Sequence, residues 1–275
     1  HIYFYYNSAI YRADLAAGEN GEKTPDFSTK AKLVGISPSI PEKTESYPQE
    51  SEMPFVNDMR ERILSSGAGR YSFFLTDHFS ADVTQNVYYY IQASTGEENV
   101  YESGTVSTDM KPIGGMLYKQ APDGQIVYGL SLPSVNGMAA DREGRLYVLT
   151  DEGIHILDDA GNRLDTVNID GYTQDGDIYS PGNLFADSLG QHVYYTSNHN
   201  FSTTVLELGG FAPTQMKEIT KLTFASHISA SAGGNLVFSD SKSGMIYEYD
   251  RETSETKPVL RWEDRFGFGC FPVVF

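Results

Sequence analysis

Hydrophobic and polar residues recur along this chain with a period of about 45 residues. Each unit has a short alternating strand, a polar turn that ends on glycine, an aromatic-rich strand, a polar loop and a third strand. The turn glycines Gly144, Gly190 and Gly234 lie 46 and then 44 residues apart. A repeat of this length with four strands per unit is typical of a β-propeller blade. The clearest copies are residues 137–157, 182–208 and 226–250.

Hairpin-type turns extend this repeat towards the N-terminus. The Asp-Gly pair at 123–124 and the Gly-Asn pair at 161–162 each precede a segment typical of an outer strand. The first turn places residues 116–132 in the outer half of an earlier blade. The inner half of that blade is expected at residues 70–79 and 86–92, with an enlarged loop at 93–113.

The two ends of the chain and one proline-rich segment complete the predicted architecture. The opening residues 1–19 match a blade from its second strand onward, so the innermost strand of that blade must come from elsewhere. Residues 266–275 are short, apolar and β-prone, and we expect them to supply it, because such pairing removes open strand edges. Residues 38–54 are rich in Pro, Glu and Ser, which predicts an exposed excursion, with an acidic interaction loop as the alternative. A sixth blade within residues 38–68 stays open.

Composition favours β-structure throughout the chain. The 19 Tyr and 15 Phe suit pleated surfaces, and the 26 Gly and 12 Pro suit turns between short strands. The best helical candidate is the short segment 59–64. The sequence therefore predicts one all-β domain over residues 1–275, a single β-propeller of five or six four-stranded blades.

Charge and cysteine content exclude several classes of function. The chain has 20 Lys and Arg against 37 Asp and Glu, a net charge of −17, which repels nucleic acids and anionic membranes. No apolar run approaches the roughly 18 residues that a membrane helix needs. The single cysteine, Cys270, excludes an internal disulfide framework and a cysteine-based zinc site. It lies in an apolar segment, so we expect a buried and inert thiol.

Residues 137–164 carry a family resemblance. Their pattern of a small apolar strand, D-x-x-G, an aromatic strand ending in Asp, a further strand and a second D-x-x-G turn resembles NHL-type and gluconolactonase-like propeller repeats. The resemblance extends over about residues 69–262. The chain is also similar to the propeller region of some bacterial solute-binding surface lipoproteins, through the Leu-x-Trp-x-Asp pattern at 260–264. This resemblance implies a bacterial, extracellular or cell-surface protein and a longer parent polypeptide.

The candidate site follows from the alignment of the repeats. In a propeller, polar residues at the start of the innermost strand and in the loop after it line the channel and one face. The first group comprises Asn136, Asn183 and His227, and the second comprises Asp77, His78, Asp151, Asn198, His199 and Asp240. Imidazole, carboxylate and amide groups are suitable ligands for a divalent metal. Asp and Asn also form turns through their own backbone, and this structural interpretation is favoured.

Resemblance to the lactonases implies a metal held by one Glu, two Asn and one Asp, and Asn136 and Asn183 match two of these positions. No Glu begins an innermost strand, since Glu143 and Glu152 lie in turns. The carboxylates of 170–177 do not have the spacing of a calcium loop. No nucleophile motif or phosphate loop is present. We therefore expect no cofactor, no metal and no catalytic residue.

Two tyrosine clusters offer rings for sugar stacking wherever a ring faces outward. Side chains alternate along a strand, so three consecutive tyrosines cannot all face the same way. Packing between adjacent blades explains the clusters without a ligand and is the favoured interpretation. The clusters are Tyr3, Tyr5 and Tyr6, and Tyr88, Tyr89 and Tyr90.

These patterns favour a non-enzymatic binding module over an enzyme. Propellers gather many loops on one face around a polar funnel, which suits a small solute, such as a glycan, or a protein partner. A metal-dependent hydrolase of the lactonase type and a scaffold without a small-molecule site are the alternatives.

Overall fold

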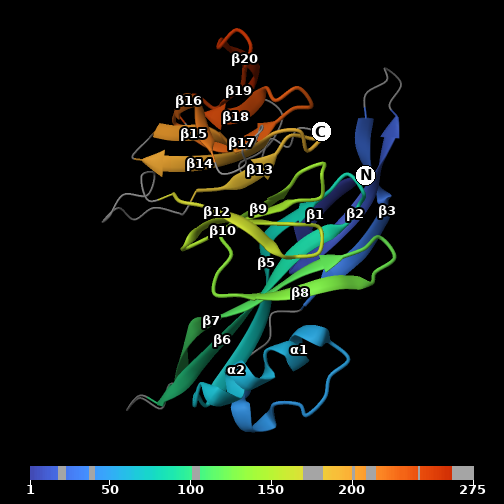
Figure 1. Ribbon diagram of the computed structural model, residues 1–275, viewed down its shortest axis with the longest axis vertical. Coiled ribbons are helices and arrows are strands. Elements are labelled where there is room, and N and C mark those ends of the chain that lie inside the picture. The colour runs from blue at the N-terminus through green and yellow to red at the C-terminus, as the bar shows by residue number, and fades with distance from the viewer. Residues whose placement is uncertain are drawn as a thin grey trace. The chain divides into compact units, whose positions relative to one another are not determined.

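A computed structural model describes residues 1–17, 23–36, 41–100, 106–169, 182–199, 202–208, 215–240 and 242–261. Antiparallel β-sheets make up most of this part of the chain, and each sheet is built from strands that follow one another in sequence (Figure 1). The chain divides into two compact units, residues 1–79 with 86–134, and residues 80–85 with 135–275. The all-β class and the blade-like sheets predicted from the repeat are confirmed.

The first unit contains two sheets and two short helices. One sheet has three strands, β1 (Ile2–Tyr6), β2 (Ala9–Ala17) and β3 (Lys23–Gly35). The other has five, β4 (Glu42–Lys43), β5 (Arg70–Ala81), β6 (Val87–Val100), β7 (Val106–Gln120) and β8 (Ile126–Leu132). Between β4 and β5 lie the 3-10 helix η1 (Thr44–Ser46) and the helices α1 (Pro54–Asp58) and α2 (Arg60–Ser65).

The segment before β5 differs from its prediction. The short strand β4 pairs with β5, and the two helices follow it, so the described part of residues 38–68 forms no sixth blade. Tyr47 is buried and its hydroxyl donates to the carbonyl of Val56 at 2.5 Å, so the excursion is partly packed rather than fully exposed. Phe55, Met59 and Ile63 add apolar anchors that the Pro- and Glu-rich composition concealed. The helix predicted at 59–64 is confirmed as α2.

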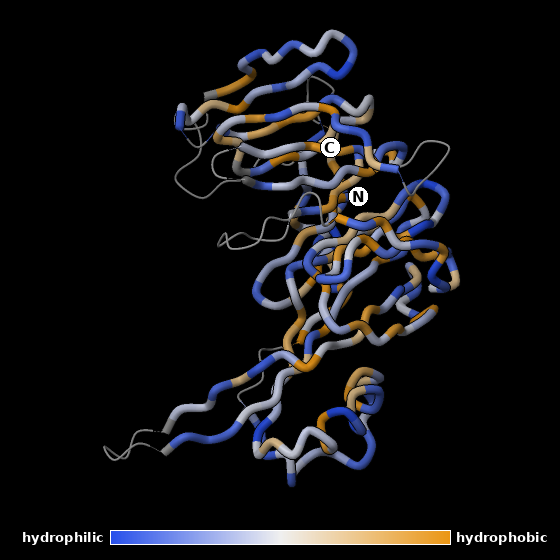
Figure 2. Tube along the Cα trace, turned by 60° about the vertical axis from the view of Figure 1, so that its left-hand side comes forward, coloured by the Kyte–Doolittle hydropathy of each residue, from blue (hydrophilic) through white to orange (hydrophobic). Residues whose placement is uncertain are grey.

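The prediction of an enlarged loop at 93–113 is also wrong. Strands β6 and β7 continue their ladder far beyond the blade, with pairs from Ser94↔Pro112 to Val100↔Val106. The distal part of this ribbon is largely hydrophilic, whereas the other sheets carry hydrophobic strands and hydrophilic turns (Figure 2). Without one buried face there is no alternation of polar and apolar residues to reveal the strands in the sequence.

The second unit contains three four-stranded sheets. Within each sheet, the strands lie side by side in the order in which they follow one another in the sequence. The first has β9 (Gly137–Ala140), β10 (Leu146–Thr150), β11 (Gly153–Leu157) and β12 (Arg163–Val167). The second has β13 (Leu184–Ala186), β14 (Val193–His199), β15 (Ser202–Leu208) and β16 (Met216–Thr223). The third has β17 (Ala225–Ala230), β18 (Leu236–Asp240), β19 (Met245–Tyr249) and β20 (Thr256–Arg261).

Four-residue turns that close on glycine join the first two strands of each sheet in the second unit, and the first two of these turns begin on Asp. In the first copy, Asp141 Oδ1 accepts the backbone N–H groups of Glu143 and Arg145 at 3.0 and 2.9 Å. Gly144 closes the turn by donating its N–H to the Asp141 carbonyl, and its φ of +82° favours glycine. Gly190 donates in the same way to the carbonyl of Asp187, and Gly234 to that of Ser231, and both have a positive φ. The predicted repeat is therefore confirmed at the level of individual hydrogen bonds.

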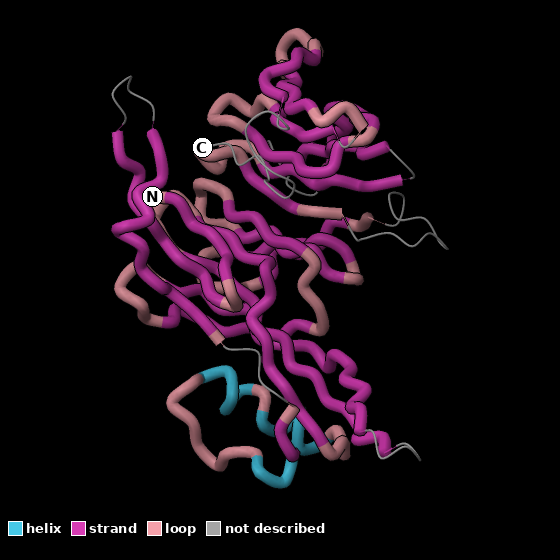
Figure 3. The backbone as a smooth tube through the Cα atoms, turned by 180° about the vertical axis from the view of Figure 1, so that it is seen from behind, coloured by secondary structure: helices cyan, strands magenta, loops and turns pink. Residues whose placement is uncertain are grey.

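Apolar side chains fill the space between neighbouring sheets within each unit. In the first unit, Tyr3 and Tyr5 pack against the main apolar cluster, to which α1 contributes Phe55 and α2 contributes Ile63. Figure 3 shows the two helices beside the long β6–β7 ribbon. Tyr88, Tyr89 and Tyr90 are all buried, with exposed fractions of 0, 5 and 0%. Packing rather than sugar stacking thus accounts for that tyrosine cluster, as the favoured interpretation predicted.

Two further predictions concern other parts of the chain. The strand predicted at 266–275, with its Cys270, and the loop predicted at 170–177 lie outside the described residues. Among the residues that the structure does describe, no helix is long and apolar enough to span a bilayer.

Candidate strand-end site

The innermost strands of the second unit lie side by side. A parallel bridge joins Asp187, just after β13, to Ala230 of β17. On the other side, the N–H of Arg142 donates to the carbonyl of Gly190 at 2.9 Å, which links the turn after β9 to the turn after β13. These contacts join the far ends of the inner strands, and the bridge shows that neighbouring inner strands run in the same direction. The beginnings of the three inner strands therefore lie at one edge of this unit.

Two residues predicted for this edge meet there directly. Asn136 immediately precedes β9, and Asp151 immediately follows β10. Because β9 and β10 are antiparallel, the start of one lies beside the end of the other, with Gly137 opposite Leu149. Asn136 Nδ2 donates to Asp151 Oδ1 at 2.8 Å. The alignment of repeats had assigned them to two different groups, and the antiparallel register brings the groups together.

Asn183 lies next to this pair. Its backbone pairs with Thr196, whose N–H donates to the Asn183 carbonyl at 2.9 Å. Its Oδ1 lies 3.3 Å from the point where a Cβ on Gly137 would stand, so the Asn183 side chain approaches the backbone beside Asn136. Asn183 and Asp151 are exposed, and Asn136 is half-buried. We call Asn136, Asp151 and Asn183 the amide rim.

The other polar strand-end residues of this unit have separate surroundings. Asn198 Oδ1 accepts the Thr203 hydroxyl at 2.8 Å within the β14–β15 hairpin. Asp240 Oδ1 accepts the N–H groups of Lys242 and Ser243, which is the turn-forming role that the sequence favoured. Both side chains are therefore engaged by their own hairpins.

Two predicted histidines of this unit lie within strands. His227 lies inside β17, and burial lowers its pKa. His199 ends β14, where its backbone pairs with Ser202. Their positions in β17 and β14 place them in the third and second sheets of the unit, whereas Asn136 and Asp151 flank strands of the first.

Asp77 and His78 belong to the first unit, and the structure does not relate them to the amide rim. Both lie inside β5, which continues to Ala81, instead of in a loop after the strand as predicted. His78 Nε2 is 3.9 Å from Asp77 Oδ1. Burial lowers the pKa of His78, and the charge of Asp77 opposes that shift.

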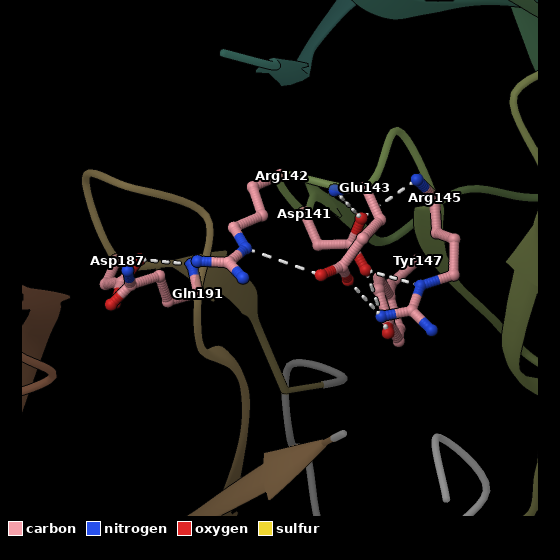
Figure 4. Close-up of polar contacts among 7 residues, drawn as sticks. All are labelled: Asp141, Arg142, Glu143, Arg145, Tyr147, Asp187 and Gln191. Carbon is pink, nitrogen blue, oxygen red and sulfur yellow. Dashed lines mark hydrogen bonds and ion pairs between the residues drawn. The ribbon is translucent and has the colours of Figure 1, made fainter. Parts of the chain in front are cut away.

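A charged network in the turn after β9 was missed by the sequence analysis (Figure 4). Asp141 is 3% exposed and its Oδ2 accepts Arg145 Nε at 2.6 Å and the Tyr147 hydroxyl at 3.3 Å. Glu143 accepts a second Arg145 nitrogen at 2.6 Å. Burial, followed by the charge of Asp141, raises the pKa of Tyr147 to about 12. The signal in the sequence was an Arg four residues after the turn Asp, which only a known strand register identifies as its partner.

The amide rim by itself does not complete the ligand set of a divalent metal. It offers one carboxylate and two amides, whereas Ca²⁺ takes six to eight oxygen ligands and usually several carboxylates. The carboxylate Oδ1 of Asp151 is already the acceptor of an amide N–H. In the part of the chain that the structure describes, no group of three or more His, Cys, Asp or Glu side chains is placed to hold a metal ion.

Comparisons with known proteins give structural neighbours only. No family model matches the chain, and neither does any curated protein. A gluconolactonase from Xanthomonas campestris is similar at 16% identity over 84% of this chain and 62% of that one, with a TM-score of 0.41. Virginiamycin B lyase from Staphylococcus aureus is similar at 11% identity over 69% and 74% of the two chains, with a TM-score of 0.39.

A third neighbour is the β-propeller domain of Cps50 (Swd1) from Myceliophteria thermophila, at 12% identity over 71% and 75% of the two chains and a TM-score of 0.39. All three scores are below 0.5, and the fold assignment rests on the sheets of this chain.

Proposed function

We propose that the chain is a non-catalytic binding module that recognises a small hydroxylated solute at the amide rim. The hydrogen bond from Asn136 to Asp151 carries this proposal, because it fixes two polar side chains from different strands at an accessible edge. The amide of Asn183 lies beside them. Amide groups offer both donors and acceptors, and a carboxylate accepts, so together they match the alternating donors and acceptors of sugar hydroxyls.

The chemistry of the rim supports binding over catalysis. General acid–base catalysis needs a titratable group aimed at the proton to be moved. At this edge Asp151 is held by the amide of Asn136, which does not titrate. A fixed hydrogen-bonding surface is a geometry suited to recognition.

The test measures the melting temperature of the chain with a panel of mono- and disaccharides, followed by calorimetric titration of any stabilising sugar. A ligand that binds only the folded state stabilises it by about 2.7 kcal/mol at one hundred times its Kd, which is readily detected. Asn136→Ala and Asn183→Ala should each abolish the shift, whereas Asn99→Ala, which removes an exposed amide from the β6–β7 ribbon, should not. Equal binding by all three variants would refute the site. If no sugar binds, a protein is the next class of ligand to test.

A metal-dependent hydrolase of the lactonase type is the second candidate. The observation in its favour is that the structure gathers two Asn and one Asp at the rim, the residue types that the lactonase resemblance implies for three of its four ligands. Melting in EDTA and then with Ca²⁺ or Zn²⁺ separates the two proposals. A rise of several degrees together with metal-dependent lactone hydrolysis would establish the enzyme, and no change would favour the binding module.

We also propose that the chain belongs to a bacterial extracellular or cell-surface protein and forms part of a longer polypeptide. The resemblance to surface lipoproteins at residues 260–264 supports this location. Protease treatment of intact cells that express the parent protein is the direct test. Degradation without lysis supports the surface location, and full protection contradicts it.

A further inference from the structure

The two faces of the β1–β3 sheet differ in what covers them. Tyr3 and Tyr5 of β1 pack into the core of the first unit. The other face is defined by the strand register, since residues directly opposite each other in a ladder point the same way. Phe4 lies opposite Tyr11, and Tyr11 lies opposite Lys32. These side chains therefore point away from the core.

Aromatic rings on this second face form one continuous cluster. The rings of Phe4 and Tyr11 are stacked, with centroids 5.5 Å apart and planes at 16°. Phe27 meets Phe4 edge-on at 5.5 Å, and 59% of its surface is exposed. Lys30 Nζ stands over the Tyr11 ring, 5.1 Å from its centroid. Exposed apolar clusters are uncommon on monomeric proteins and usually mark an interaction surface. We call Phe4, Tyr11, Phe27, Lys30 and Lys32 the aromatic–lysine face.

The local charge of this face is opposite to that of the whole chain. The chain carries a net charge of −17, yet the charged members of this face are two lysines. The nearby acids Asp14 and Asp26 lie opposite each other in the ladder, and Asp14 adjoins Ala13, which lies opposite Ile2 on β1. Ile2 points to the same face of the sheet as Phe4, and Ala13, directly opposite Ile2, points there as well. Side chains alternate along a strand, so Asp14 points to the opposite face, and so does its ladder partner Asp26. A ligand that approaches this face therefore meets the lysines first.

We propose that the aromatic–lysine face binds a carboxylated glycan. The flat C–H face of a sugar ring packs on the exposed Phe27 ring and its neighbour Phe4, as amphipathic ligands do on aromatic side chains. The sugar carboxylate pairs with Lys30 Nζ, which the Tyr11 ring already holds beside the cluster. This site lies in the first unit and is independent of the amide rim.

Charge density favours a glycan over other anionic polymers. Duplex DNA carries one negative charge per about 1.7 Å, which a chain of net charge −17 repels strongly. An acidic peptide matches the lysines but offers a ring only where it also carries an aromatic residue, whereas a glycan has a ring in every unit. A glycan that carries one carboxylate per sugar satisfies both halves of the face.

The experiment titrates the full chain with oligogalacturonate at about 0.15 M salt and measures binding by calorimetry. Phe27→Ala and Lys30→Gln should each weaken binding by about tenfold or more, because each removes one half of the recognition. Both side chains are exposed, so the melting temperature should stay within about 2 °C of the parent value. Asn136→Ala should bind oligogalacturonate as the parent does, which separates this site from the amide rim.

The matched control is Lys242→Gln. Lys242 Nζ stands 4.9 Å from the ring centroid of Phe224, so this variant removes a lysine from a comparable ring contact in the second unit. Parent-like binding is expected. Equal losses from Lys242→Gln and Lys30→Gln would show general attraction to lysines and overturn the proposal.

Comparison ligands give the remaining outcomes. The methyl-esterified oligosaccharide, which lacks the carboxylates, should bind at least tenfold more weakly. Equal or tighter binding of poly-glutamate or a single-stranded oligonucleotide would assign the face to another class of anion. Absence of binding both to oligogalacturonate and to a hyaluronan oligosaccharide would also overturn the proposal.

Discussion

Asp141 and Asp187 occupy the same position in the inner turns of successive sheets, yet only Asp141 has a partner for each carboxylate oxygen. In both residues Oδ1 accepts two backbone N–H groups of the turn. Oδ2 of Asp141 is bound by Arg145 and Tyr147. Oδ2 of Asp187 is buried and has no hydrogen-bond partner among the described residues. The two turns share backbone chemistry and differ in how their side-chain charge is compensated.

Substitution of each Asp by Asn should therefore have opposite consequences. Asp141→Asn removes the charge that Arg145 faces and should lower the free energy of unfolding by about 1–3 kcal/mol. Asp187→Asn keeps the turn acceptor and removes a buried charged oxygen without a partner among the described residues, so stability should be unchanged or higher. Urea denaturation of both variants measures the difference. Equal losses would contradict this account of the two turns.

The close contact between the turns after β9 and β13 predicts a second difference, this time between glycines. At Gly190 φ is +64°, and a Cβ there would lie 2.7 Å from the backbone nitrogen of Arg142. Gly190→Ala should therefore cost more than the roughly 1 kcal/mol that a positive φ alone costs. Gly124 is the matched control, because its φ is +90° and nothing lies within 4 Å of the position that a Cβ would take there. Thermal melts should show a clearly larger loss for Gly190→Ala than for Gly124→Ala.

Sequence reasoning succeeded where a single local rule decides the structure. A D-x-x-G turn depends only on the Asp side chain as an acceptor and on the glycine that closes it, so the sequence around Asp141 and Gly144 was enough to predict that turn. It failed for the β6–β7 ribbon, whose distal part has no buried face, and for Tyr47, whose burial depends on helices that follow it in the chain. Those contacts depend on tertiary packing that composition does not report.

The candidate site was predictable only in part for the same reason. Asn136 and Asp151 were both singled out as polar strand-end residues, but their hydrogen bond depends on the antiparallel register of β9 and β10. The sequence did not reveal the aromatic–lysine face. Side chains alternate along residues 2–6, but nearly all of them are aromatic, so the pattern leaves open which set faces the core. Only the position of the neighbouring sheet decides it.

We expect the folded chain to lose stability in acid because of the buried ring of His155. The ring is 3% exposed and lies between the hydroxyls of Thr150 and Thr166, at 3.3 and 3.0 Å. Burial, followed by the charge of Arg163, lowers the pKa of His155 below 6.5. The folded state therefore binds this proton less readily than the unfolded state does. The stability contribution is fully present above pH 6.5 and declines as the pH falls through that value towards the lowered pKa.

The measurement is the free energy of unfolding in guanidinium chloride between about pH 7.5 and pH 5. His155→Gln removes the titrating group and should flatten the pH dependence relative to the parent chain. His78→Gln provides a comparison, because burial lowers the pKa of both rings and a neighbouring carboxylate opposes the shift at each, Asp77 at His78 and Glu152 at His155. Identical pH profiles for the parent and His155→Gln would rule out this histidine as a source of acid sensitivity.

The side chains that could compensate Asp187 have other partners. The strand register makes His192 and Tyr194 of this sheet equivalent to Arg145 and Tyr147. His192 Nδ1 is 2.6 Å from Glu207 Oε1, and the Tyr194 hydroxyl donates to the carbonyl of Gly234 at 3.1 Å. Arg251, in the turn before β20, donates to Glu207 Oε2 at 2.7 Å. Glu207 thus joins the second and third sheets of this unit.

Glu207→Gln should lower the free energy of unfolding by about 1–3 kcal/mol, because it leaves the half-buried guanidinium of Arg251 with a neutral partner. The matched control is Glu143→Gln, since Glu143 also accepts an arginine nitrogen at 2.6 Å but its side chain is 55% exposed, against 13% for Glu207. Solvent screens an exposed pair, so the control should cost under about 1 kcal/mol. A cost for Glu143→Gln as large as that for Glu207→Gln would show that burial does not decide the strength of these contacts.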